Sequence, residues 1–555
     1  MKHSLVALLL AFLFFCGGCV SDTISDPFSE QMQETDSAAS VTNCPYAEPP
    51  GWASAFQPKP KDSAPAGNTT GPRVDAVSTM YVDSDPENFG PVTRITVTAE
   101  DNEGVPYDIE SYYRAKDQTV YLFLPSTADL SAVTVWTLHR NGTETGRYTL
   151  DFTAKDYGVF WGDGYCAVKA MQSGLPSLCI EIDEEEGTLS AMNRDGSHTT
   201  ECFGDLTLVV PEALAEENHW DPVTVSREND PSTPGTMKMR GRGNWTWNQE
   251  KKPYQITCEK PVDLCGMGKA KRWILLANVM DASLLRDQVL YELAADMGMP
   301  YSVDIQPVDL FVNGEYLGSY SLCEKVETRE ERVDLGPEGG YLLELDHYYQ
   351  NERYTFTTKK GKNFTLHSPE TDEAVEEIKT IVNAIEKEIY AEDGIPEGID
   401  KASFLRYWWL QDLSRNNDTF IGSNFFFYRN AEQKLYAGPI WDMDNTFGIW
   451  GGGENLMTKG WHSANRGWLK HLWNSEAFRD ALEAYYREEG KSLFARLPDR
   501  VLELREYIRE SAEMNYLVNR RIDYVNSGTQ SWDEDIDYLL RFIRARLAWY
   551  EDQLG

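Results

Sequence analysis

Two aspartates one residue apart form the most distinctive candidate site in the sequence. Asp442 and Asp444 lie among the apolar residues Ile440, Trp441 and Phe447. Alternate residues of a strand share a face, so both carboxylates could reach one ion. Carboxylate oxygens suit a hard cation such as Mg²⁺ or Mn²⁺. A strand end with two solvated acids is the alternative, but the apolar neighbours favour burial, and buried acids need partners.

A stretch rich in Asp and Asn precedes this pair, at residues 411–419 (QDLSRNNDT). In a catalytic loop, one such Asp orients or deprotonates an acceptor hydroxyl, and an Asn helps to bind metal. Asp412 and Asn417 have the D-x-x-x-x-N spacing of protein kinases. The same residue types at the end of a helix also form caps and turns without any catalytic role.

Basic residues are concentrated in a third segment. Arg240 and Arg242 alternate with glycines in residues 239–247 (MRGRGNWTW), where backbone N–H groups and guanidinium groups can both bind an anion. Lys251 and Lys252 follow and lead into a strand, an arrangement that resembles the phosphate-binding lysine of kinases. Lys252 is the better candidate because it is nearer the apolar strand. A solvated charged turn is the alternative interpretation.

The composition limits the functions that these residues can serve. The chain has 555 residues, too many for one hydrophobic core, so two or three domains are expected. Its 16 Trp, 29 Tyr and 22 Phe provide enough apolar area to exclude global disorder. The net charge of -37 argues against nucleic acid as a partner, because phosphate backbones need a basic surface. The acidity also keeps an exported protein soluble.

Residues 1–19 are typical of an export signal. A short basic start precedes an apolar run from Leu5 to Phe15, which is shorter than the roughly 20 residues of a membrane span. Gly17-Gly18-Cys19 resembles a bacterial lipobox, in which Cys19 would carry lipid. The segment therefore predicts either a lipid anchor at Cys19 or plain secretion, and in both cases an extracytoplasmic protein.

The cysteines offer few functional options. After Cys19 there is no C-x-x-C or H-E-x-x-H spacing, so a metal–thiolate site is not expected. An exported protein could form disulfides, and Cys258 and Cys265 are the nearest pair. Cys323 lies in an apolar strand pattern and is most simply a buried thiol.

A linker and a small domain come before the segment that carries the candidate site. Residues 20–72 are rich in Ser, Asp, Thr, Pro and Gly, as in a flexible tether. Residues 73–160 have short alternating runs and an Asn141-Gly142 turn. They predict a small antiparallel, sandwich-like β-domain, more simply a spacer than a binding module.

Residues 174–555 must then position the chemistry. Residues 174–365 predict strands, a helix over 283–297, a hairpin over 308–320 and a strand over 340–345. From 366 onward the pattern predicts helices, interrupted by a strand at 424–428. Polar motifs at the junction predict a cleft between two lobes. The predicted helices of the second part cover residues 373–390, 404–413, 477–493, 501–517 and 535–554.

The order of the motifs is that of a kinase catalytic core: glycine-rich loop, strand lysine, helix, hairpin, Asp/Asn loop and acidic pair. With these motifs in this order, the sequence resembles the CotH kinase family of atypical secreted kinases, from about Cys179 to the C-terminus. The resemblance is carried by Arg240-Gly241-Arg242-Gly243-Asn244, Lys252-Pro253-Tyr254, Leu276-Ala277-Asn278, Leu284-Leu285-Arg286, Val312-Asn313-Gly314-Glu315-Tyr316-Leu317-Gly318, Asn416-Asn417-Asp418, Asn424-Phe425 and Trp441-Asp442-Met443-Asp444.

The resemblance implies a fold, a reaction and partners. The fold is α+β and two-lobed like a protein kinase, with a β-rich N-lobe (174–365) and a helical C-lobe (366–555). The reaction is transfer of the γ-phosphoryl group of ATP, with Mg²⁺ or Mn²⁺, to Ser or Thr of an exported protein.

The resemblance also implies roles for individual residues. Asp418, rather than Asp412, matches the catalytic-loop acid, and the adenine-contacting hinge would fall at residues 323–326. The helix partner of the strand lysine is expected at Glu292, on the basis of its helix alone. In chain order, the expected phosphate-binding residues and helix partner are Arg240, Arg242, Lys252 and Glu292, and the expected metal ligands are Asn417, Asp442 and Asp444, with the primary aspartate left open.

Two other functions stay open on the sequence alone. A surface adhesin or scaffold could keep the fold without catalysing transfer, and ATP is scarce outside a bacterium. The Trp-rich motifs and many acids also suit carbohydrate binding, for which the separation of paired carboxylates would be the structural test.

Overall fold

The computed structural model describes most of the chain beyond residue 72. The predicted export signal with Cys19, and the predicted linker 20–72, lie outside the described residues. None of the helices in the described ranges has the length and apolar character of a membrane-spanning segment. These ranges are 73–74, 77–81, 92–100, 106–128, 135–148, 156–161, 164–185, 187–226, 237–449 and 456–555.

Nine strands form the first sheet, in the order β1-β2-β8-β9-β5-β4-β3-β6-β7. Most neighbours are antiparallel, as predicted, but β2–β8 and β5–β9 are parallel. Asn141 and Gly142 join β6 to β7 and both have positive φ, as a type I′ turn requires. The strands are β1 (Arg73–Val74), β2 (Val77–Tyr81), β3 (Val92–Glu100), β4 (Pro106–Arg114), β5 (Thr119–Phe123), β6 (Val135–Arg140), β7 (Thr143–Tyr148), β8 (Asp156–Trp161) and β9 (Gly164–Met171).

The next eight strands form a barrel-like sheet, which the sequence did not predict. Its order is β10-β16-β17-β15-β14-β13-β11-β12, and an additional β10–β11 pairing closes the ring. Alternate residues of β11 are buried, as expected when one face lines a packed interior. The strands are β10 (Ser177–Ile182), β11 (Glu201–Val209), β12 (Val223–Val225), β13 (Met237–Gly241), β14 (Tyr254–Asp263), β15 (Lys269–Leu276), β16 (Ile305–Val312) and β17 (Glu315–Glu324).

A glycine permits the closure of this barrel. Gly204 of β11 pairs with Ile182 of β10. A Cβ atom at Gly204 would lie 1.9 Å from the carbonyl oxygen of Glu181. Because real Cβ atoms do not approach a carbonyl so closely, a side chain here would separate the two strands.

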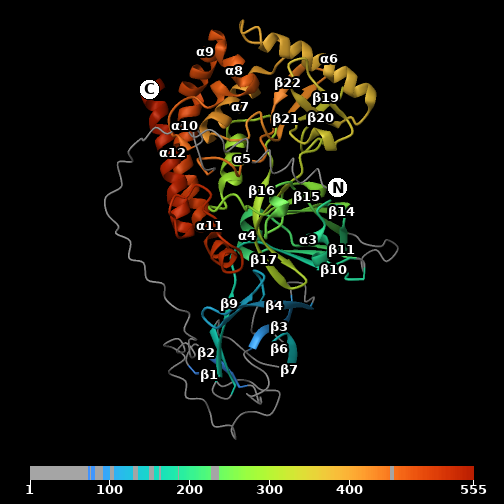
Figure 1. Cartoon of the computed structure of the whole chain (residues 1–555), viewed down its shortest axis with the longest axis vertical. Helices are drawn as coiled ribbons and strands as arrows, with labels where there is room; N and C mark the ends of the chain where they lie inside the picture. The colour runs from blue at the N-terminus through green and yellow to red at the C-terminus, as the bar shows by residue number, and fades with distance from the viewer. Residues whose placement is uncertain are drawn as a thin grey trace, which may run out of the picture. The chain divides into compact units, whose positions relative to one another are not determined.

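A third sheet, of five strands in the order β19-β20-β18-β21-β22, lies beside helices α6 (Asp372–Ile389) and α7 (Lys401–Ser414) (Figure 1). It combines strands from both sides of residue 366, where the sequence suggested a change from strands to helices. The part of the chain after 366 is therefore helical with an embedded sheet. The strands are β18 (Gly340–Leu345), β19 (Thr355–Thr357), β20 (Asn363–Ser368), β21 (Asn424–Arg429) and β22 (Lys434–Ala437).

The helices confirm the predicted apolar periodicity, with differences in detail. The predicted 477–493 helix is interrupted by a π-helical turn at Tyr486–Gly490, and α8 was not predicted. In Figure 1, α11 and α12 lie against each other. The helices are α3 (Leu189–Arg194), α4 (Glu212–Asn218), α5 (Arg286–Asp296), α6 (Asp372–Ile389), α7 (Lys401–Ser414), α8 (Gly467–Asn474), α9 (Glu476–Tyr485), α10 (Lys491–Ala495), α11 (Leu497–Val518) and α12 (Trp532–Leu554), with 3₁₀ turns at Thr246–Asn248, Tyr349–Asn351 and Ser463–Asn465.

Helix α7 carries the candidate catalytic segment at its C-terminal end. Asp400 caps its first turn by accepting a hydrogen bond from the Ser403 N–H at 2.7 Å. Trp408 and Trp409 are fully buried in its middle and anchor it in the largest apolar core. The helix ends where Arg415 adopts a left-handed conformation, with φ 50°, which turns the chain toward Asp418.

Cys258 and Cys265, the nearest pair of cysteines after Cys19, are not joined. Cys258 of β14 and Cys265 are buried free thiols, as are Cys202 and Cys323. Burial raises the pKa of Cys258 to about 12, so it is an inert core thiol rather than a reactive one. The prediction that Cys323 is a buried thiol is confirmed.

Candidate active site

A cavity of about 720 Å³ brings most of the predicted site residues together. Its lining includes the end of β13, the segment after α7 and the loop after β22, three segments far apart in the sequence. Lys252 and Glu292 are not among its lining residues. The predicted residues that do line it are Arg240, Arg242, Asn417, Asp418, Asp442 and Asp444.

The arginines are held on one wall by a compact turn. Arg240 is the penultimate residue of β13, and Arg242 follows the strand. A Cβ atom at Gly241 would lie 2.3 Å from the Trp247 ring, and one at Gly243 would lie 2.4 Å from the Thr246 hydroxyl. The glycines are thus required by the packing of this turn, a reason independent of any bound anion.

Lys252 has a structural role. Its ammonium group donates to the carbonyl oxygens of Trp247 (2.6 Å) and Gln249 (2.8 Å), and it lies 5.1 Å from the centroid of the Trp247 ring. The expectation that Lys252 binds phosphate in the cavity is therefore not supported by its position. Lys251 also points away from the cavity and donates to the Asn515 side chain at 2.9 Å.

A different lysine faces the cavity. Lys325 follows β17 in the predicted hinge and lines the cavity together with Val326. Burial lowers the pKa of Lys325 to about 8, and the positive charge of Arg272 adds to this effect. The sequence had assigned this segment to adenine contacts, so the lysine itself was missed.

Glu292 lies on the face of α5 that packs against α11. Its carboxylate accepts hydrogen bonds from Arg500 at 2.6 and 2.9 Å and from Gln288 at 3.0 Å. The prediction that Glu292 pairs with Lys252 is wrong, because Arg500 is its ionic partner. Helical spacing alone could not distinguish the faces of α5.

The structure separates the two candidate catalytic aspartates. Asp412 is fully buried, where its carboxylate accepts from Arg546 (2.7 Å), Tyr550 (2.6 Å) and the Ser463 N–H (2.9 Å). Asp418 opens onto the cavity. Of these two aspartates, Asp418 is therefore the one that lines the cavity, and Asp412 is held within the core.

Asp418 is oriented by amides. It accepts a hydrogen bond from the Asn445 side chain at 3.1 Å, and its own backbone N–H donates to the Asn416 side chain at 2.9 Å. Burial raises the pKa of Asp418, and the Asn445 bond partly offsets this. The neighbouring Asn417 also lines the cavity.

Asp442 and Asp444 lie in an irregular loop, which we call the DxD loop (residues 438–447). The expectation that both lie on one face of a strand is wrong, because β22 ends at Ala437 and Asp442 has φ 60°. Surrounding protein displaces bulk water and raises the pKa of Asp442 to about 6, with a further contribution from the charge of Asp418. Burial, followed by the charge of Asp442, raises the pKa of Asp444 well above its usual range.

The sequence missed Asp287, a buried acid beside this loop. It is the second residue of α5, and it accepts a hydrogen bond from the Met443 N–H at 2.9 Å. Burial raises the pKa of Asp287 to about 7, and the charge of Asp442 contributes. The only signal was its place directly after the quoted motif Leu284-Leu285-Arg286.

The cavity lining also includes polar groups that the sequence missed. Glu344 of β18 accepts from His367 at 2.6 Å and from the Ser423 hydroxyl. At the rim, Trp245 and Tyr348 are 42% and 46% exposed, which is unusual for large aromatic side chains. These residues leave apolar surface available to a ligand at the cavity mouth.

A family model, CotH kinase protein, matches residues 239–550, more than half of the chain. The chain belongs to the CotH kinase family. None of the curated proteins compared with the chain matches it.

The CotH match covers every predicted site residue, but it begins well after Cys179, inside β13. The strands β10, β11 and β12 therefore precede the matched region, although they belong to the same barrel-like sheet. The nine-stranded sheet also lies before the match, as the motifs had suggested.

The carboxylates of Asp442 and Asp444 in this CotH protein could bind a cation that is also bound by the phosphate oxygens of a ligand. Within the described residues, no group of three or more His, Cys, Asp or Glu side chains is arranged to hold a metal ion. Mg²⁺, however, usually binds proteins through one or two carboxylates, completed by phosphate oxygens and water. Neighbouring acids add to the cost of ionising both residues, Asp418 in the case of Asp442 and Asp442 in the case of Asp444, and a divalent cation would relieve this cost.

Proposed function

We propose that the protein is an extracytoplasmic kinase that transfers the γ-phosphoryl group of ATP to a Ser or Thr hydroxyl of an exported protein. The proposal rests on one observation: two basic residues and three acids line the same cavity. They are Arg240, Arg242, Asp418, Asp442 and Asp444. Membership of the CotH kinase family supports kinase chemistry in general.

Each group has a definite task in this proposal. Asp418 accepts a hydrogen bond from the acceptor hydroxyl and aligns its oxygen with the γ-phosphorus. Arg240 and Arg242 neutralise charge on the phosphate oxygens as the bond to the leaving oxygen breaks. Mg²⁺ or Mn²⁺, held by Asp442, Asp444 and Asn417, would supply further charge neutralisation at the phosphates.

We also propose that the arginines and the acids of the site belong to two different lobes. The arginines extend from the barrel-like sheet, whereas Asp418 and the DxD loop follow α7 and β22. This division resembles the β-rich and helical lobes of a protein kinase, with the cavity between them.

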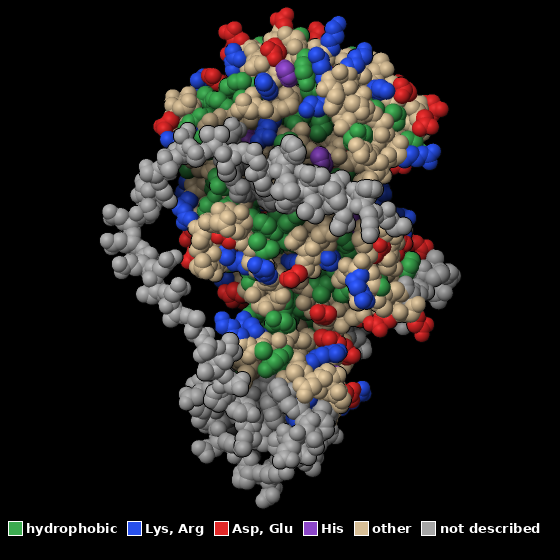
Figure 2. Space-filling model, viewed as in Figure 1, with side chains coloured by type: hydrophobic (Ala, Val, Ile, Leu, Met, Phe, Trp, Pro, Cys, Tyr) green, Lys and Arg blue, Asp and Glu red, His purple; other side chains and the backbone are tan. Residues whose placement is uncertain are grey.

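The proposed setting follows from the N-terminal sequence. Residues 1–19 would direct export, and Cys19 would anchor the chain by lipid unless the protein is secreted. Acidic and basic side chains are interspersed on the face seen in Figure 2. Together with the net charge of -37, this distribution supports a protein rather than a nucleic-acid partner.

The test is transfer of label from γ-labelled ATP to the purified chain or to co-exported proteins, with Mg²⁺ or Mn²⁺. Asp418→Asn and Asp444→Ala should each reduce transfer at least about 100-fold. Asp372→Asn, which changes an exposed acid at the start of α6, is the matched control and should leave the rate unaltered. Full activity in folded Asp444→Ala protein would refute the site assignment.

A non-catalytic adhesin or scaffold is the second candidate. The position of Lys252, outside the cavity and bound to two carbonyl oxygens, favours it, because kinases use such a lysine on the phosphates. A scaffold should bind its partner equally well with Asp418→Asn or Asp444→Ala, whereas an enzyme should lose label transfer.

A further inference from the structure

Helix α5 holds the DxD loop by its backbone. The Met443 N–H donates to Asp287 at 2.9 Å, and the Asp442 N–H donates to the Tyr291 hydroxyl at 3.3 Å. Arg286 donates through Nε to the carbonyl oxygen of Thr446 at 3.0 Å. Because Asp442 has the left-handed φ of 60°, which a non-glycine residue adopts at a cost, such external bonds are needed to keep it in place.

Arg286 depends in turn on the loop before α5. Its guanidinium forms a buried ion pair with Asp281, and both side chains are 3% exposed. The backbone N–H of Arg286 donates to Asp281 at 2.8 Å, and its Nη1 donates to the Ser283 hydroxyl at 2.9 Å. We call residues 281–285 the support loop, because these contacts fix Arg286 against the DxD loop.

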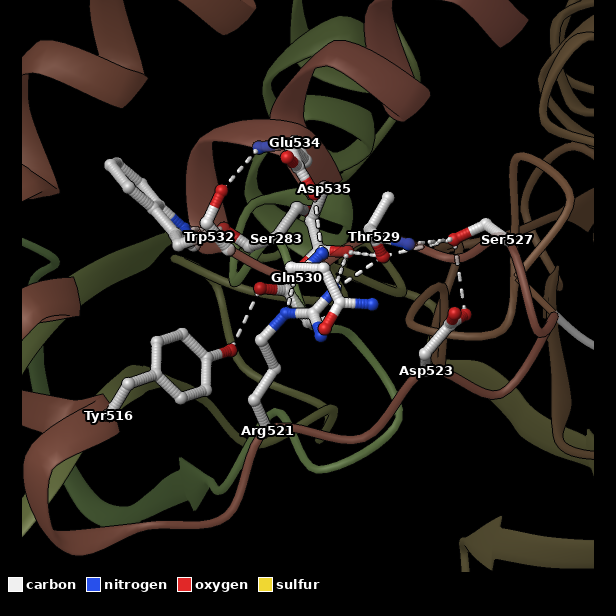
Figure 3. Close-up of polar contacts among 12 residues, drawn as sticks. Ser283, Tyr516, Arg521, Asp523, Ser527, Thr529, Gln530, Trp532, Glu534 and Asp535 are labelled. Carbon is white, nitrogen blue, oxygen red and sulfur yellow. Dashed lines mark hydrogen bonds and ion pairs between the residues drawn. The ribbon is translucent and has the colours of Figure 1, made fainter. Parts of the chain in front are cut away.

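The support loop is bound from outside by the C-terminal helices. The Tyr516 hydroxyl on α11 donates to the carbonyl oxygen of Ala282 at 2.8 Å. The indole N–H of Trp532 on α12 donates to the carbonyl oxygen of Ser283 at 2.9 Å, and Figure 3 shows both side chains pointing to this loop. Trp532 is 8% exposed, so its bond is shielded from water.

The connection between α11 and α12 fixes these two side chains relative to each other. Arg521 binds Asp535 through two nitrogens, with Nη2 at 2.7 Å from Oδ1. Thr529 donates to the same Asp535 oxygen at 2.8 Å (Figure 3). We call Tyr516, Trp532 and this Arg521–Thr529–Asp535 cluster the C-terminal clamp.

We propose that the C-terminal clamp positions the DxD loop through the support loop and Arg286, and thereby sets the affinity of the site for a metal–nucleotide complex. The part concerning metal–nucleotide affinity rests on the proposed function. Tyr516, Trp532 and Arg286 are positioning residues in this scheme. Tyr516 and Trp532 act through the support loop, and Arg286 acts through its hydrogen bond to the carbonyl oxygen of Thr446.

The test removes one polar contact at a time. Tyr516→Phe deletes only a hydroxyl group, and Trp532→Phe deletes the indole N–H. Tyr507→Phe, on the same helix but with no part in these contacts, is the matched control. The first measurement is hydrogen–deuterium exchange of the DxD loop amides in the purified chain, and the second is the Kd for Mn²⁺·ATP compared with ATP alone.

Loss of one hydrogen bond should speed exchange of the Met443 and Phe447 amides about 3- to 10-fold, with β16 and β17 unaltered. The Kd for Mn²⁺·ATP should rise by a similar factor, while that for ATP alone changes less. Arg286→Lys should restore part of what Arg286→Met loses. Tyr507→Phe should match the unaltered protein.

Two results are decisive. Unaltered DxD loop exchange in folded Tyr516→Phe and Trp532→Phe proteins would overturn the inference, whether or not the protein is a kinase. Faster exchange in a chain whose unaltered form binds no Mn²⁺·ATP would support the coupling and refute the proposed function. Because Tyr516→Phe leaves the aromatic ring in place, this variant keeps the test valid if Trp532→Phe fails to fold.

Discussion

Two aspartates near the end of α7, Asp412 in its last turn and Asp418 after it, have opposite surroundings. Asp412 faces the helical core and is satisfied by Arg546, Tyr550 and a backbone N–H. Asp418 faces the cavity, where it accepts a hydrogen bond from Asn445 and where its charge adds to the cost of ionising Asp442. An acid paired with a cation inside the core contributes to the fold, whereas acids crowded against one another are costly to keep ionised and suit a cationic or phosphate-bound ligand.

The largest effect should come from breaking the core pair. Arg546→Ala leaves the carboxylate of Asp412 buried without its cation, so the free energy of unfolding should fall by about 3–5 kcal/mol. Urea unfolding followed by circular dichroism measures this change. A loss below about 1 kcal/mol would show that Asp412 is not the structural acid of the comparison.

Asp287, which lies against the DxD loop, should respond in the opposite direction. Asp287→Asn removes a buried charge but keeps an oxygen for the Met443 N–H, so it should stabilise the protein at pH 8 by about 1–3 kcal/mol. The pKa of Asp287 is raised to about 7 in the folded state, so the folded protein takes up this proton more readily than the unfolded chain. The stabilisation should therefore be present above pH 7 and disappear as the pH falls toward 4.

Urea unfolding at pH 8 and pH 4.5 tests this sign. An Asp287→Asn effect that grows as the pH falls would contradict the assignment of Asp287 to the crowded acids. Asp372→Asn is the exposed control, and its effect should be small at both values of pH.

The basic residues allow a finer comparison. Arg242 lies in the cavity, 5.7 Å from the Trp441 ring centroid, whereas Lys252 binds carbonyl oxygens outside it. Arg242→Met should raise the Kd for Mg²⁺·ATP about 10-fold, as expected for the loss of a charge-assisted contact. Lys252→Met should leave this Kd unaltered and lower the melting temperature. Calorimetric titration with Mg²⁺·ATP measures the Kd of both variants. A higher Kd in Lys252→Met but not in Arg242→Met would contradict this comparison.

The smallest effect belongs to Glu292. Its pair with Arg500 is partly exposed, and such pairs contribute about 0–1 kcal/mol. Glu292→Gln should therefore change the free energy of unfolding by less than about 1 kcal/mol and leave Mg²⁺·ATP binding unaltered. A large loss of Mg²⁺·ATP binding in Glu292→Gln would show that Glu292 does take part in the site.

Local patterns predicted the elements well, because they depend on neighbours in sequence. The strand Gly340–Leu345 and helix α6 agree with the apolar spacing to within one residue at each end. The closure of the barrel depends on β10 and β11 meeting at Gly204, a long-range contact that no local spacing reports.

Residue type and spacing predicted Asp442 and the two arginines as candidates, whereas the preference for Asp418 came from the family resemblance. The candidate site was missed where orientation decides. Lys252 and Glu292 have suitable chemistry but point elsewhere, and Asp287 is identified only by its contact with Met443. A side chain's direction depends on tertiary packing, which the sequence pattern does not contain.

The closure of the barrel before the family match also determines how the protein can be shortened. A fragment that begins at residue 239 would lack β10 and β11, and so would leave unpaired edges on β16 and β13. Exposed edges of this kind recruit strands from other molecules, so the fragment should aggregate during expression. The shortest soluble version of the protein should therefore begin ahead of Ser177, the first residue of β10.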